Sequence, residues 1–382
     1  MISEERSRGP ILFLGCLPFG QIRQRPQHLA VEISLHAKVL YVEPHRSWLR
    51  APLSGIAAAA AATAPTEGGL EILTPPPALP FSGYLPVVNR VNYARTAALV
   101  RQRLEGSGWR APRAIVASFP KQVDLLRFFP GSPVCYDVMD DYPLFFDAWQ
   151  GAVIARLHDR LLRRADVVVV ASETLAERCR GAARRIVRVA NGVSPAFHEA
   201  CARAEADLSV SALPAPRFGY VGTIERWIDF EILRLLAHTF PEGSVVLIGP
   251  VSCARPPLPA NVHFLGAKPH EALPPILRAL DAGLVPFRRS RLTDAVNPVK
   301  VYEYLSAGLP VLSSDFAGIH EFGSTVSVCR TPDEWVGAAR RALDQRGGSD
   351  AARRRSFASS HLWPDRAREF LRAIEEVEVG RG

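Results

Sequence analysis

Lys300 and Glu303 are the strongest chemical signal in the sequence, within the run NPVKVYEYLSAGLPVLSSD at residues 297–315. Pro298 suits the first turn of a helix and Gly308 suits its end, so lysine and glutamate should lie one turn apart near the helix N-terminus. Free N–H groups beside a lysine favour a phosphate, and the carboxylate can accept hydrogen bonds from two ribose hydroxyls. The alternative is a surface helix with an ordinary Lys–Glu pair.

A second segment with phosphate-binding chemistry is FGYVGTIERWIDFEIL, residues 218–233. A strand that ends at Gly222, followed by Thr223, places backbone N–H groups at the carboxyl ends of the strands, where open α/β sheets bind ligands. Arg226 follows in the turn, and its guanidinium can make bidentate phosphate contacts that a lysine cannot. The alternative is a linker turn with an exposed arginine.

Two adjacent carboxylates, Asp140 and Asp141, follow the apolar run Val134–Asp137 in the segment VCYDVMDDYPLFFD. A strand through Asp137 leaves both just past its carboxyl end, facing a cleft in a doubly wound domain. A carboxylate there can take the proton from an attacking hydroxyl group. We favour Asp140 over Asp141 as that base because of its spacing from the strand. The alternative for both is capping of the next helix.

The first loop, GCLPFGQIRQRPQHLA at residues 15–30, combines glycines with cationic and polar side chains at a strand-to-helix turn. Its G-x4-G spacing is a weak phosphate signal, and no lysine–serine pair completes a P-loop. Gly20 flanks the turn, and Arg25 and His28 follow at the helix start. Capping of that helix is the simpler role for His28.

Short apolar runs alternate with longer amphipathic stretches, which is typical of βα units and a parallel sheet buried on both faces. The alternation occurs twice, so we expect an α/β chain of two Rossmann-like domains. The predicted strands are Ile11–Leu14, Lys38–Val42, Ala114–Ser118, Val134–Asp137, Val167–Ala171 and Ile186–Val189, then Arg217–Val221, Ser244–Ile248, Val262–Leu265, Ala282–Val285 and Pro310–Ser313. The predicted helices are Pro26–His36, Val91–Glu105 and Val153–Arg164, then Ile228–Thr239, His270–Leu280, Val299–Ala307 and Pro332–Gln345.

A polar and alanine-rich segment, Glu199–Pro216, separates the two sets and is predicted to be the interdomain linker. We therefore expect an N-terminal domain over residues 1–205 and a C-terminal domain over residues 206–382. A terminal helix is predicted at 363–377 and is able to pack on either domain.

The composition is that of a globular protein, with 382 residues, 48% of them apolar, and a formal net charge of +8. Six cysteines lack metal-ligand spacing, which argues against a zinc site and a disulfide framework. The sequence shows neither a secretory signal nor an apolar run of about 18 residues, so we expect a cytoplasmic protein. The charge fits an anionic partner such as a nucleotide diphosphate or a membrane surface. Nucleic acid is disfavoured because the arginines are dispersed.

Two irregular segments, residues 51–69 and 74–86, are rich in alanine or proline and are predicted to be surface loops. The apolar stretch at residues 79–88, together with the net charge of +8, motivates a further hypothesis. We expect peripheral contact with an anionic membrane, at the inner face of the cytoplasmic membrane.

These motifs, in this order, resemble the group 1 glycosyltransferases, which have the GT-B fold. The similar segments are EYLSAGLPV (303–311), the strand-turn YVGTI (220–224), YDVMDDY (136–142), ADVVVVASETLAERC (165–179) and VANGVSPAFH (189–198), while RPQHLA (25–30) resembles relatives of the bacterial teichuronic-acid and exopolysaccharide type. The resemblance implies two Rossmann-like domains that face each other across a central cleft.

The resemblance also implies roles for the candidate residues. The nucleotide-sugar would be held by Gly222, Thr223, Arg226, Asn297, Pro298, Lys300 and Glu303, with the lysine on the diphosphate and the glutamate on the ribose. Gly20, Arg25 and His28 would contact the acceptor or the diphosphate. Many retaining members carry two glutamates separated by seven residues, and Ala295 stands at the place of the first, so the stereochemistry stays open.

The sequence therefore predicts a glycosyltransferase that moves a sugar from a nucleotide diphosphate-sugar, with UDP implied by the resemblance, to a glycan or lipid-linked acceptor. The pathway would be cell-envelope or exopolysaccharide synthesis, with the acceptor in the N-terminal domain and the nucleotide in the C-terminal domain. Positive charge and a helix dipole would stabilise the departing diphosphate, without a metal or cofactor. The alternatives are a nonhydrolysing nucleotide-sugar epimerase and a non-catalytic sugar-nucleotide-binding subunit of an envelope-assembly complex.

Overall fold

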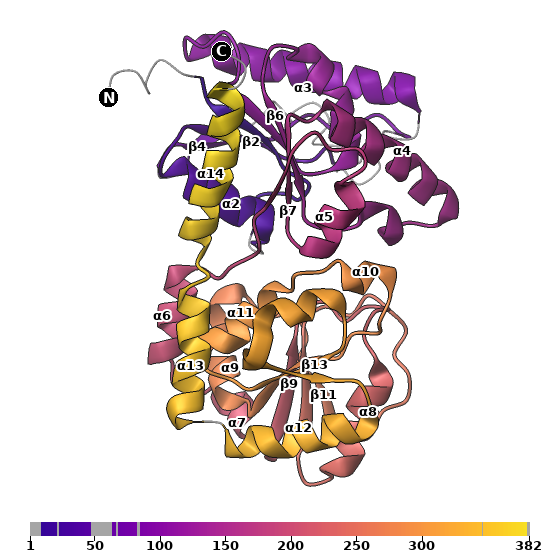
Figure 1. The fold of residues 1–382 in the computed structure, drawn as a ribbon, viewed down its shortest axis with the longest axis vertical. Coiled ribbons are helices and arrows are strands. Elements are labelled where there is room, and N and C mark those ends of the chain that lie inside the picture. The colour runs from indigo at the N-terminus through magenta and orange to yellow at the C-terminus, as the bar shows by residue number, and fades with distance from the viewer. Residues whose placement is uncertain are drawn as a thin grey trace, which may run out of the picture. The chain divides into compact units, whose positions relative to one another are not determined.

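The chain divides into two compact units, each built around a parallel β-sheet (Figure 1). The computed structural model describes residues 9–20, 23–46, 63–65, 68–81, 85–345 and 347–379. Unit 1 comprises Met1–Ala190 and Arg366–Gly382, and unit 2 comprises Asn191–Asp365. The boundary expected between residues 205 and 206 therefore falls inside unit 2.

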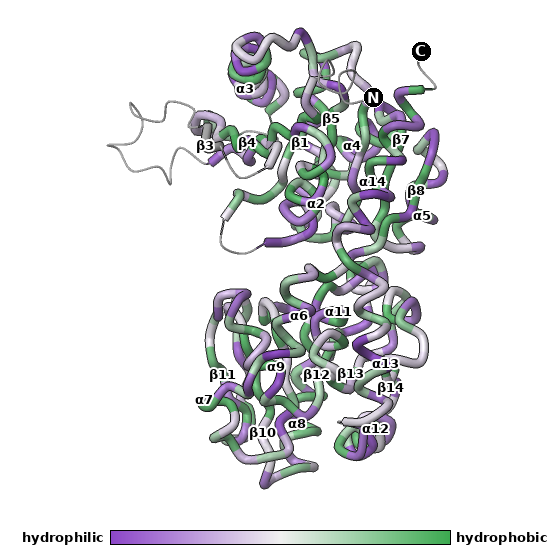
Figure 2. The backbone as a smooth tube through the Cα atoms, turned by 90° about the vertical axis from the view of Figure 1, so that its left-hand side faces the viewer, coloured by the Kyte–Doolittle hydropathy of each residue, from purple (hydrophilic) through white to green (hydrophobic). Residues whose placement is uncertain are grey.

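The sheet of unit 1 has the strand order β3-β4-β2-β1-β5-β6-β7-β8. Its strands are β1 (Ile11–Leu14), β2 (Val39–Val42), β3 (Thr63–Pro65), β4 (Leu70–Leu73), β5 (Ala114–Ala117), β6 (Val134–Val138), β7 (Val167–Val170) and β8 (Ile186–Arg188). Strand β3 runs antiparallel to β4, and the other neighbours are parallel. Strands β1, β2, β5, β6 and β7 are buried at every residue, so they stand out in the sequence as apolar runs (Figure 2).

The helices of unit 1 begin where a proline or a capping side chain starts them. They are α2 (Arg25–Ser34), α3 (Pro86–Gly106), α4 (Ala148–Arg164) and α5 (Glu173–Cys179), with short 3-10 helices η3 (Pro120–Asp124), η4 (Leu126–Phe128) and η5 (Tyr142–Phe145). The side chain of Asp147 accepts a hydrogen bond from the Gln150 N–H, so α4 begins five residues before the predicted start at Val153. Helix α3 likewise begins at Pro86 and not at Val91.

The C-terminal helix α14 (Trp363–Val379) belongs to unit 1 from Arg366 onward. Arg113 of unit 1 donates to Glu378 over 2.7 Å and forms a longer ion pair with Glu375 at 3.4 Å. An ion pair between Arg185 and Glu376 joins the same helix to the end of the sheet. The helix predicted at residues 363–377 therefore packs on the N-terminal unit after residue 365.

The sheet of unit 2 is parallel, with the strand order β11-β10-β9-β12-β13-β14. Its strands are β9 (Arg217–Val221), β10 (Ser244–Ile248), β11 (Val262–Phe264), β12 (Ala282–Val285), β13 (Val311–Ser314) and β14 (Val326–Cys329). The surrounding helices are α6 (Pro195–Arg203), α7 (Leu208–Ser211), α8 (Phe230–Thr239), α9 (Leu273–Ala279), α10 (Arg291–Asp294), α11 (Val299–Ser306), α12 (Pro332–Asp344) and α13 (Gly348–Ser359), with 3-10 helices η6 (His270–Ala272) and η7 (Ala317–Thr325). Strand β14 and helix α13 were not predicted.

The segment predicted to be an interdomain linker, Glu199–Pro216, is instead part of unit 2. It contains the end of α6 and all of α7, which Asp207 caps by accepting a hydrogen bond from the Val210 N–H. Cys201 and Val210 are buried in the core of this unit. The polar and alanine-rich composition of the segment is that of helix surfaces and short turns, and its few apolar side chains fix it to the domain.

The two loops predicted at residues 51–69 and 74–86 have different outcomes. Most of the first lies outside the described residues, apart from β3 and residues 68–69. In the second, residues 74–81 lack helix and extended strand, and Pro86 begins α3. Within the apolar stretch at 79–88, residues 86–88 are helical, residues 79–81 are not, and residues 82–84 lie outside the described residues.

Candidate functional site

Two glycines shape the carboxyl edge of the sheet in unit 2. Gly222, just after β9, has φ of 134° and donates its N–H to the Ile248 carbonyl over 2.8 Å. Gly249, just after β10, has φ of 149°, and a Cβ there would lie 2.0 Å from the Gly222 oxygen. Both positions require glycine because side chains are excluded and the backbone lies in the left-handed region.

Lys300 lies directly against this turn. Its Nζ donates to the Tyr220 hydroxyl over 3.0 Å and lies 4.4 Å from the Tyr220 ring centroid and 4.9 Å from that of Phe287. A Cβ built on Gly222 would come within 3.0 Å of the same Nζ. In the described part of the chain no carboxylate pairs with this ammonium, so aromatic faces and a phenol hold the charge at the turn.

Tyr304 explains why helix α11 presents Lys300 at this position. Its hydroxyl accepts a hydrogen bond from the Val221 N–H over 2.7 Å, which ties the helix to the last residue of β9. The ring packs on Gly283, where an added Cβ would lie 2.5 Å from it. The helix N-terminus and the end of β9 are therefore fixed together, and the first N–H groups of α11 have no partner inside the helix.

The remaining residues of the predicted turn are more exposed. Thr223 and Arg226 are exposed, and the Thr223 carbonyl accepts a hydrogen bond from the Tyr220 hydroxyl over 2.9 Å. The Arg226 N–H bonds Glu225 over 2.9 Å, and the described contacts of Lys300 do not include Arg226. The structure thus brings Gly222 and Lys300 together, and a shared phosphate contact with Arg226 stays a prediction.

Glu303 is almost buried, with 8% of its surface exposed. Its Oε1 lies 2.7 Å from Nε2 of His270 in η6, and the His270 ring stacks on Phe197 at 4.6 Å between centroids. This pair fixes the carboxylate and leaves Oε2 without a hydrogen bond in the part of the chain that the structure describes. His270 was missed by the sequence analysis because only the fold brings it beside a residue 33 positions away.

Asn297 has a structural role that its sequence motif did not reveal. It is 2% exposed, and its Oδ1 accepts hydrogen bonds from the Asn191 N–H over 3.0 Å and from the Tyr302 hydroxyl over 3.2 Å. Its Nδ2 donates to Glu321 over 3.0 Å. Pro298 is buried and is the N-cap residue of α11, which begins at Val299 as predicted. Their predicted contacts with nucleotide stay predictions.

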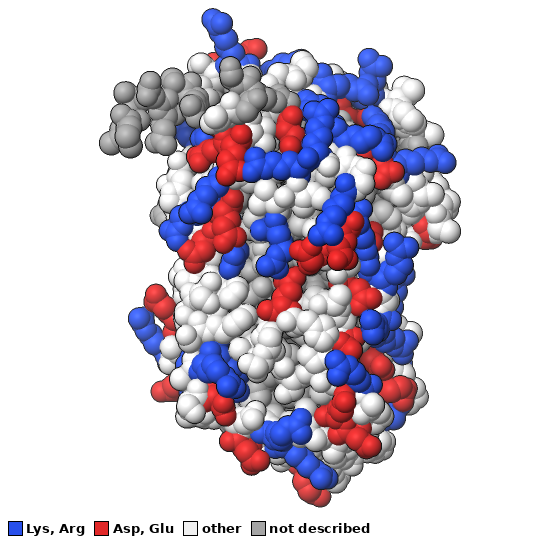
Figure 3. All heavy atoms as spheres, in the orientation of Figure 1, with Lys and Arg blue, Asp and Glu red and all other residues white. Residues whose placement is uncertain are grey.

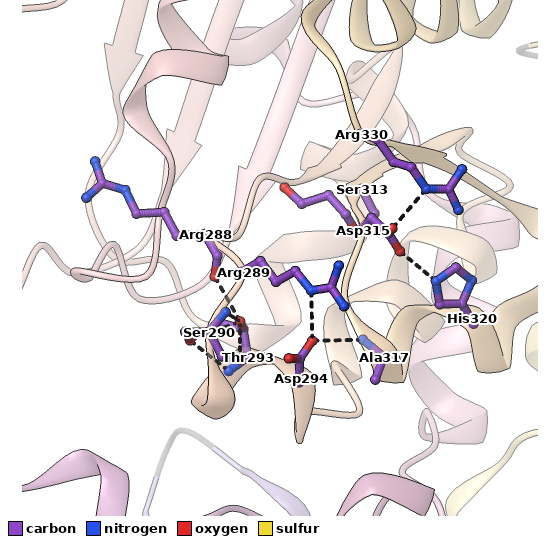
Figure 4. A network of polar contacts seen from close by, with 11 residues as sticks. Arg288, Arg289, Ser290, Thr293, Asp294, Ser313, Asp315, Ala317, His320 and Arg330 are labelled. Atoms are coloured by element: carbon purple, nitrogen blue, oxygen red, sulfur yellow. Dashed lines mark hydrogen bonds and ion pairs between the residues drawn. The ribbon is translucent and has the colours of Figure 1, made fainter.

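Polar residues also gather at the ends of β12 and β13 (Figure 4). Asp294 accepts a hydrogen bond from the Ala317 N–H over 3.1 Å and lies 3.8 Å from Arg289. Asp315 lies 2.6 Å from His320 and 2.9 Å from Arg330. Burial raises the pKa of Asp315, but the bonds from His320 and Arg330 outweigh it and hold that pKa below its usual value.

The position of the missing first glutamate, Ala295, is fully buried. Its neighbour Asp294 is half-buried and is engaged by the Ala317 N–H and Arg289. Neither residue therefore presents an unpaired carboxylate of the kind found in the two-glutamate pattern.

Arg25 and Asp137 form a buried ion pair in unit 1, with 2% and 0% of their side chains exposed. Nε of Arg25 lies 3.0 and 3.1 Å from the two carboxylate oxygens, and Nη2 lies 2.9 Å from Oδ1. A further bond runs from Nη1 to the Ala190 carbonyl over 3.3 Å. The pair therefore supports the loop that follows β6, and the predicted contact of Arg25 with acceptor or diphosphate stays a prediction.

The two candidate bases have different environments. Burial raises the pKa of Asp140 to about 7; the positive charge of Arg25 opposes this shift, and the charges of Asp141 and Asp137 add to it. Asp141 instead forms an ion pair with Arg178 at 2.6 Å. A pKa near the operating pH suits a general base, so Asp140 is the better candidate.

Gly20 and His28 contribute less to a defined site. Gly20 is exposed, and an added Cβ there would meet nothing within 4 Å. His28 is 7% exposed, and its N–H donates to the Gln24 carbonyl over 3.0 Å within the start of α2. Among the described residues, no group of three or more His, Cys, Asp or Glu side chains is arranged to hold a metal ion.

Comparison with known proteins relates this geometry to an enzyme family. The chain resembles solved GT-B structures. One is sucrose-phosphate synthase from Thermosynechococcus elongatus, with a TM-score of 0.70 and 13% identity over an alignment that covers 98% of this chain and 100% of that chain. It also resembles Anabaena Alr3699/HepE in complex with UDP and glucose (TM-score 0.65, 16% identity, 96% and 100%). The fold is therefore GT-B, with two Rossmann-like units, and the predicted fold class is confirmed.

The family signal lies in the second unit. Residues 215–345 match the family model of the glycosyl transferases group 1. The putative teichuronic acid biosynthesis glycosyltransferase TuaH of Bacillus subtilis (strain 168) is 23% identical over 235 residues, or 58% of this chain. The match spans 59% of that relative's length. Residues 215–345 are thus similar to the group 1 glycosyl transferases, which confirms the predicted resemblance.

The raised pKa of the half-buried Asp140 predicts a pH-dependent effect on stability. In the unfolded chain this carboxyl ionises near its usual pKa of 3.8, but in the folded protein only at about 7. The folded state thus holds the extra proton between these values, and its stability falls as the pH rises through them. Asp140→Asn removes this cost, so it should raise the melting temperature, relative to wild type, more at about pH 8.5 than at about pH 4.5.

The matched control is Asp344→Asn, an exposed residue of α12. Its effect on the melting temperature should be the same at both pH values. An Asp140→Asn effect that is also independent of pH would show that this carboxyl ionises normally.

Proposed function

We propose that the protein is a glycosyltransferase that moves a sugar from a nucleotide diphosphate-sugar to a glycan or lipid-linked acceptor. The observation that carries this proposal is the position of Lys300, against the Gly222 turn and within the segment that matches the group 1 family model. The pathway would be cell-envelope or exopolysaccharide synthesis, a proposal supported by the similarity to TuaH.

In this proposal the donor diphosphate binds at the turn of Gly222 and Thr223. Lys300 and the N-terminus of α11 supply positive charge, which stabilises the negative charge that develops on the departing diphosphate. Glu303, held by His270, accepts hydrogen bonds from the ribose through Oε2. This chemistry needs no metal ion, and the leaving group departs as the nucleoside diphosphate.

UDP is the proposed nucleotide. Two of the similar solved structures contain it or a derivative: HepE with UDP and glucose, and the Escherichia coli trehalose-6-phosphate protein with UDP-2-fluoro glucose (TM-score 0.67, 14% identity, 96% of this chain and 98% of that chain). The proposal covers hexosyl and uronosyl donors.

Unit 1 supplies the acceptor side of the proposed reaction. Asp140 takes the proton from the acceptor hydroxyl as that oxygen attacks the anomeric carbon, and the sugar–phosphate bond breaks. Its raised pKa makes the ionised form predominant above about pH 7 while keeping it basic enough to accept the proton.

Lys300→Ala tests the diphosphate contact. We expect the affinity for UDP to fall at least tenfold, about 1.4 kcal/mol, because a charge-assisted hydrogen bond is lost, while the affinity for uridine stays unchanged. Isothermal titration calorimetry with both ligands measures this difference. Arg340→Ala, which removes an exposed cation from α12, is the charge-matched control and should bind both ligands as wild type does.

Equal loss of uridine and UDP affinity in Lys300→Ala would contradict the proposed contact. Transfer of a radiolabelled sugar to a lipid or glycan separates a transferase from an epimerase, which would instead return an epimerised nucleotide-sugar. If the protein is a non-catalytic subunit, its Lys300→Ala variant would still complement a deletion strain.

His270→Ala tests the orientation of Glu303. Loss of the hydrogen bond at 2.7 Å frees the carboxylate, so the affinity for uridine and for UDP should fall together, by about 1 kcal/mol or roughly fivefold. Calorimetry measures both affinities. His263→Ala in β11 is the control, and His270→Gln, which can still donate to the carboxylate, should restore part of the loss. Unchanged uridine affinity in His270→Ala would contradict this role.

We also propose peripheral contact with an anionic membrane on the cytoplasmic side. Among the described residues no helix is both long and apolar enough to cross a bilayer. On the face shown in Figure 3, cationic and anionic side chains are interspersed. The exposed side of α3 is different, because Val87 and Val91 are 75% and 43% exposed and Arg90 and Arg95 lie beside them in sequence.

The double variant Val87→Ser/Arg90→Ala tests the membrane contact. Removing one cation near an anionic surface costs about 1 kcal/mol, so the fraction sedimenting with phosphatidylglycerol vesicles at low salt should fall about fivefold. Leu208→Ser/Arg203→Ala removes the same two kinds of exposed residue from unit 2 and should bind as wild type. Absence of wild-type binding at low salt, or equal loss in both variants, would contradict the proposal.

A further inference from the structure

Unit 1 contains a cavity of about 510 Å³ whose lining includes none of the candidate nucleotide-binding residues. It is bounded by the segments that follow β1, β2 and β5, together with α3, and so lies at the carboxyl edge of the sheet. This is the edge where parallel α/β sheets bind ligands, and the volume is in the range of small-molecule sites.

Three polar side chains that line the cavity, Glu43, His45 and Gln122, already have hydrogen-bond partners. Both oxygens of Glu43 accept hydrogen bonds, from the Phe19 N–H over 2.8 Å and the Thr74 hydroxyl over 2.7 Å. His45 lies 2.7 Å from the Thr96 hydroxyl. Gln122 is fully used: its oxygen accepts from two backbone N–H groups and its nitrogen donates to two carbonyls.

These saturated groups decide what kind of molecule fits. A bare sugar would bury hydroxyl groups that find few free partners on these side chains, which is unfavourable. Burial, with a smaller contribution from Arg95, lowers the pKa of His45 to about 4, so this ring is uncharged at neutral pH and adds no charge to the wall. The remaining lining is mostly apolar and includes Ala78, Leu79 and Phe81.

The cavity is open to solvent along an apolar rim. Leu79 is 44% exposed and Phe81 is 70% exposed. Phe81 also has φ of 60°, an unfavourable backbone conformation for a bulky residue, and such strain is found preferentially at functional sites. Lys121, half-buried in the wall, brings a positive charge to the same cavity.

The inner end of the cavity borders the loop of the candidate base. Cys16 lines the cavity, and its thiol pKa is raised to about 12 mainly by burial, with contributions from the nearby charges of Asp137 and Asp140. Phe119, another lining residue, packs edge-on against Tyr142, two residues after Asp140, at 5.0 Å between ring centroids. A molecule in the cavity would thus approach Asp140 from within unit 1.

We propose that this cavity binds the hydrocarbon part of a lipid-linked acceptor that carries an anionic linker, with Lys121 attracting the anion. The proposal rests on the function proposed above and selects, from its two acceptor classes, the lipid-linked one. The hydrocarbon chain of the acceptor would lie against the apolar wall and rim. Its reacting hydroxyl would lie at the end of the cavity nearest Asp140.

The test is calorimetric binding of dodecyl phosphate below its micellar concentration. Wild-type protein should bind dodecyl phosphate but neither inorganic phosphate nor maltose. This comparison shows whether binding requires the hydrocarbon chain and not only the anion or a sugar. Ala78→Phe places a ring in the cavity, so the affinity should fall at least tenfold, about 1.4 kcal/mol. Lys121→Ala should lower the affinity for dodecyl phosphate several-fold but leave the affinity for dodecyl maltoside unchanged.

Phe81→Ser, at the exposed rim, is a second variant that does not disturb the core and should also weaken dodecyl phosphate. Leu208→Ser removes an 85% exposed leucine from unit 2 and is the matched control, with wild-type affinity expected. UDP affinity is measured in parallel and should be unchanged in every variant. If the wild-type protein binds dodecyl phosphate but not UDP, the proposed function is refuted and the cavity proposal is not.

Three outcomes would overturn the cavity proposal. The first is that the wild type does not bind dodecyl phosphate. The second is that Phe81→Ser and a folded Ala78→Phe both bind it with wild-type affinity. The third is that maltose or inorganic phosphate binds more tightly than dodecyl phosphate. If Ala78→Phe does not fold, the Phe81→Ser result alone decides.

Discussion

The account depends on one cation that has no carboxylate partner among the residues that the structure describes. Lys300 is fixed by the Tyr220 hydroxyl at 3.0 Å and by two aromatic faces, directly over the glycine turn that ends β9. Such a lysine keeps its charge available to a ligand, whereas a lysine in an ion pair would have to give up its partner first. The surrounding features serve this placement, because Tyr304 ties α11 to β9 and Gly222 leaves the space that the ammonium needs.

The fold could be predicted where strands are buried on both sides. Strands such as β1 and β12 are continuous apolar runs, and their bounds agree with the prediction to the residue. Strands β4 and β14 have half-buried residues in the middle and lack that signal. The end of α6, from Glu199 onward, was included in the predicted linker because Cys201 is its one buried apolar side chain, and only tertiary packing shows that burial.

The sequence predicted the site residues that belong to local motifs but not the partners that hold them in place. Local motifs identified Gly222, Lys300 and Glu303, but sequence gives no distance between segments 80 positions apart, such as Tyr220 and Lys300. The partners that fix the site therefore came only from the fold, as with His270 beside Glu303. Environment also separated Asp140 from Asp141: both are half-buried, but desolvation raises the pKa of Asp140, whereas Asp141 pairs with Arg178.

The central claim is that the Lys300 ammonium and the glycine turn grip a diphosphate. A crystal structure of the protein with UDP tests it most directly. The account predicts diphosphate oxygens at about 3 Å from Nζ of Lys300, beside the backbone of Gly222 and Thr223. Density for UDP elsewhere in unit 2, with Lys300 still bonded to Tyr220 and away from any phosphate, would contradict it.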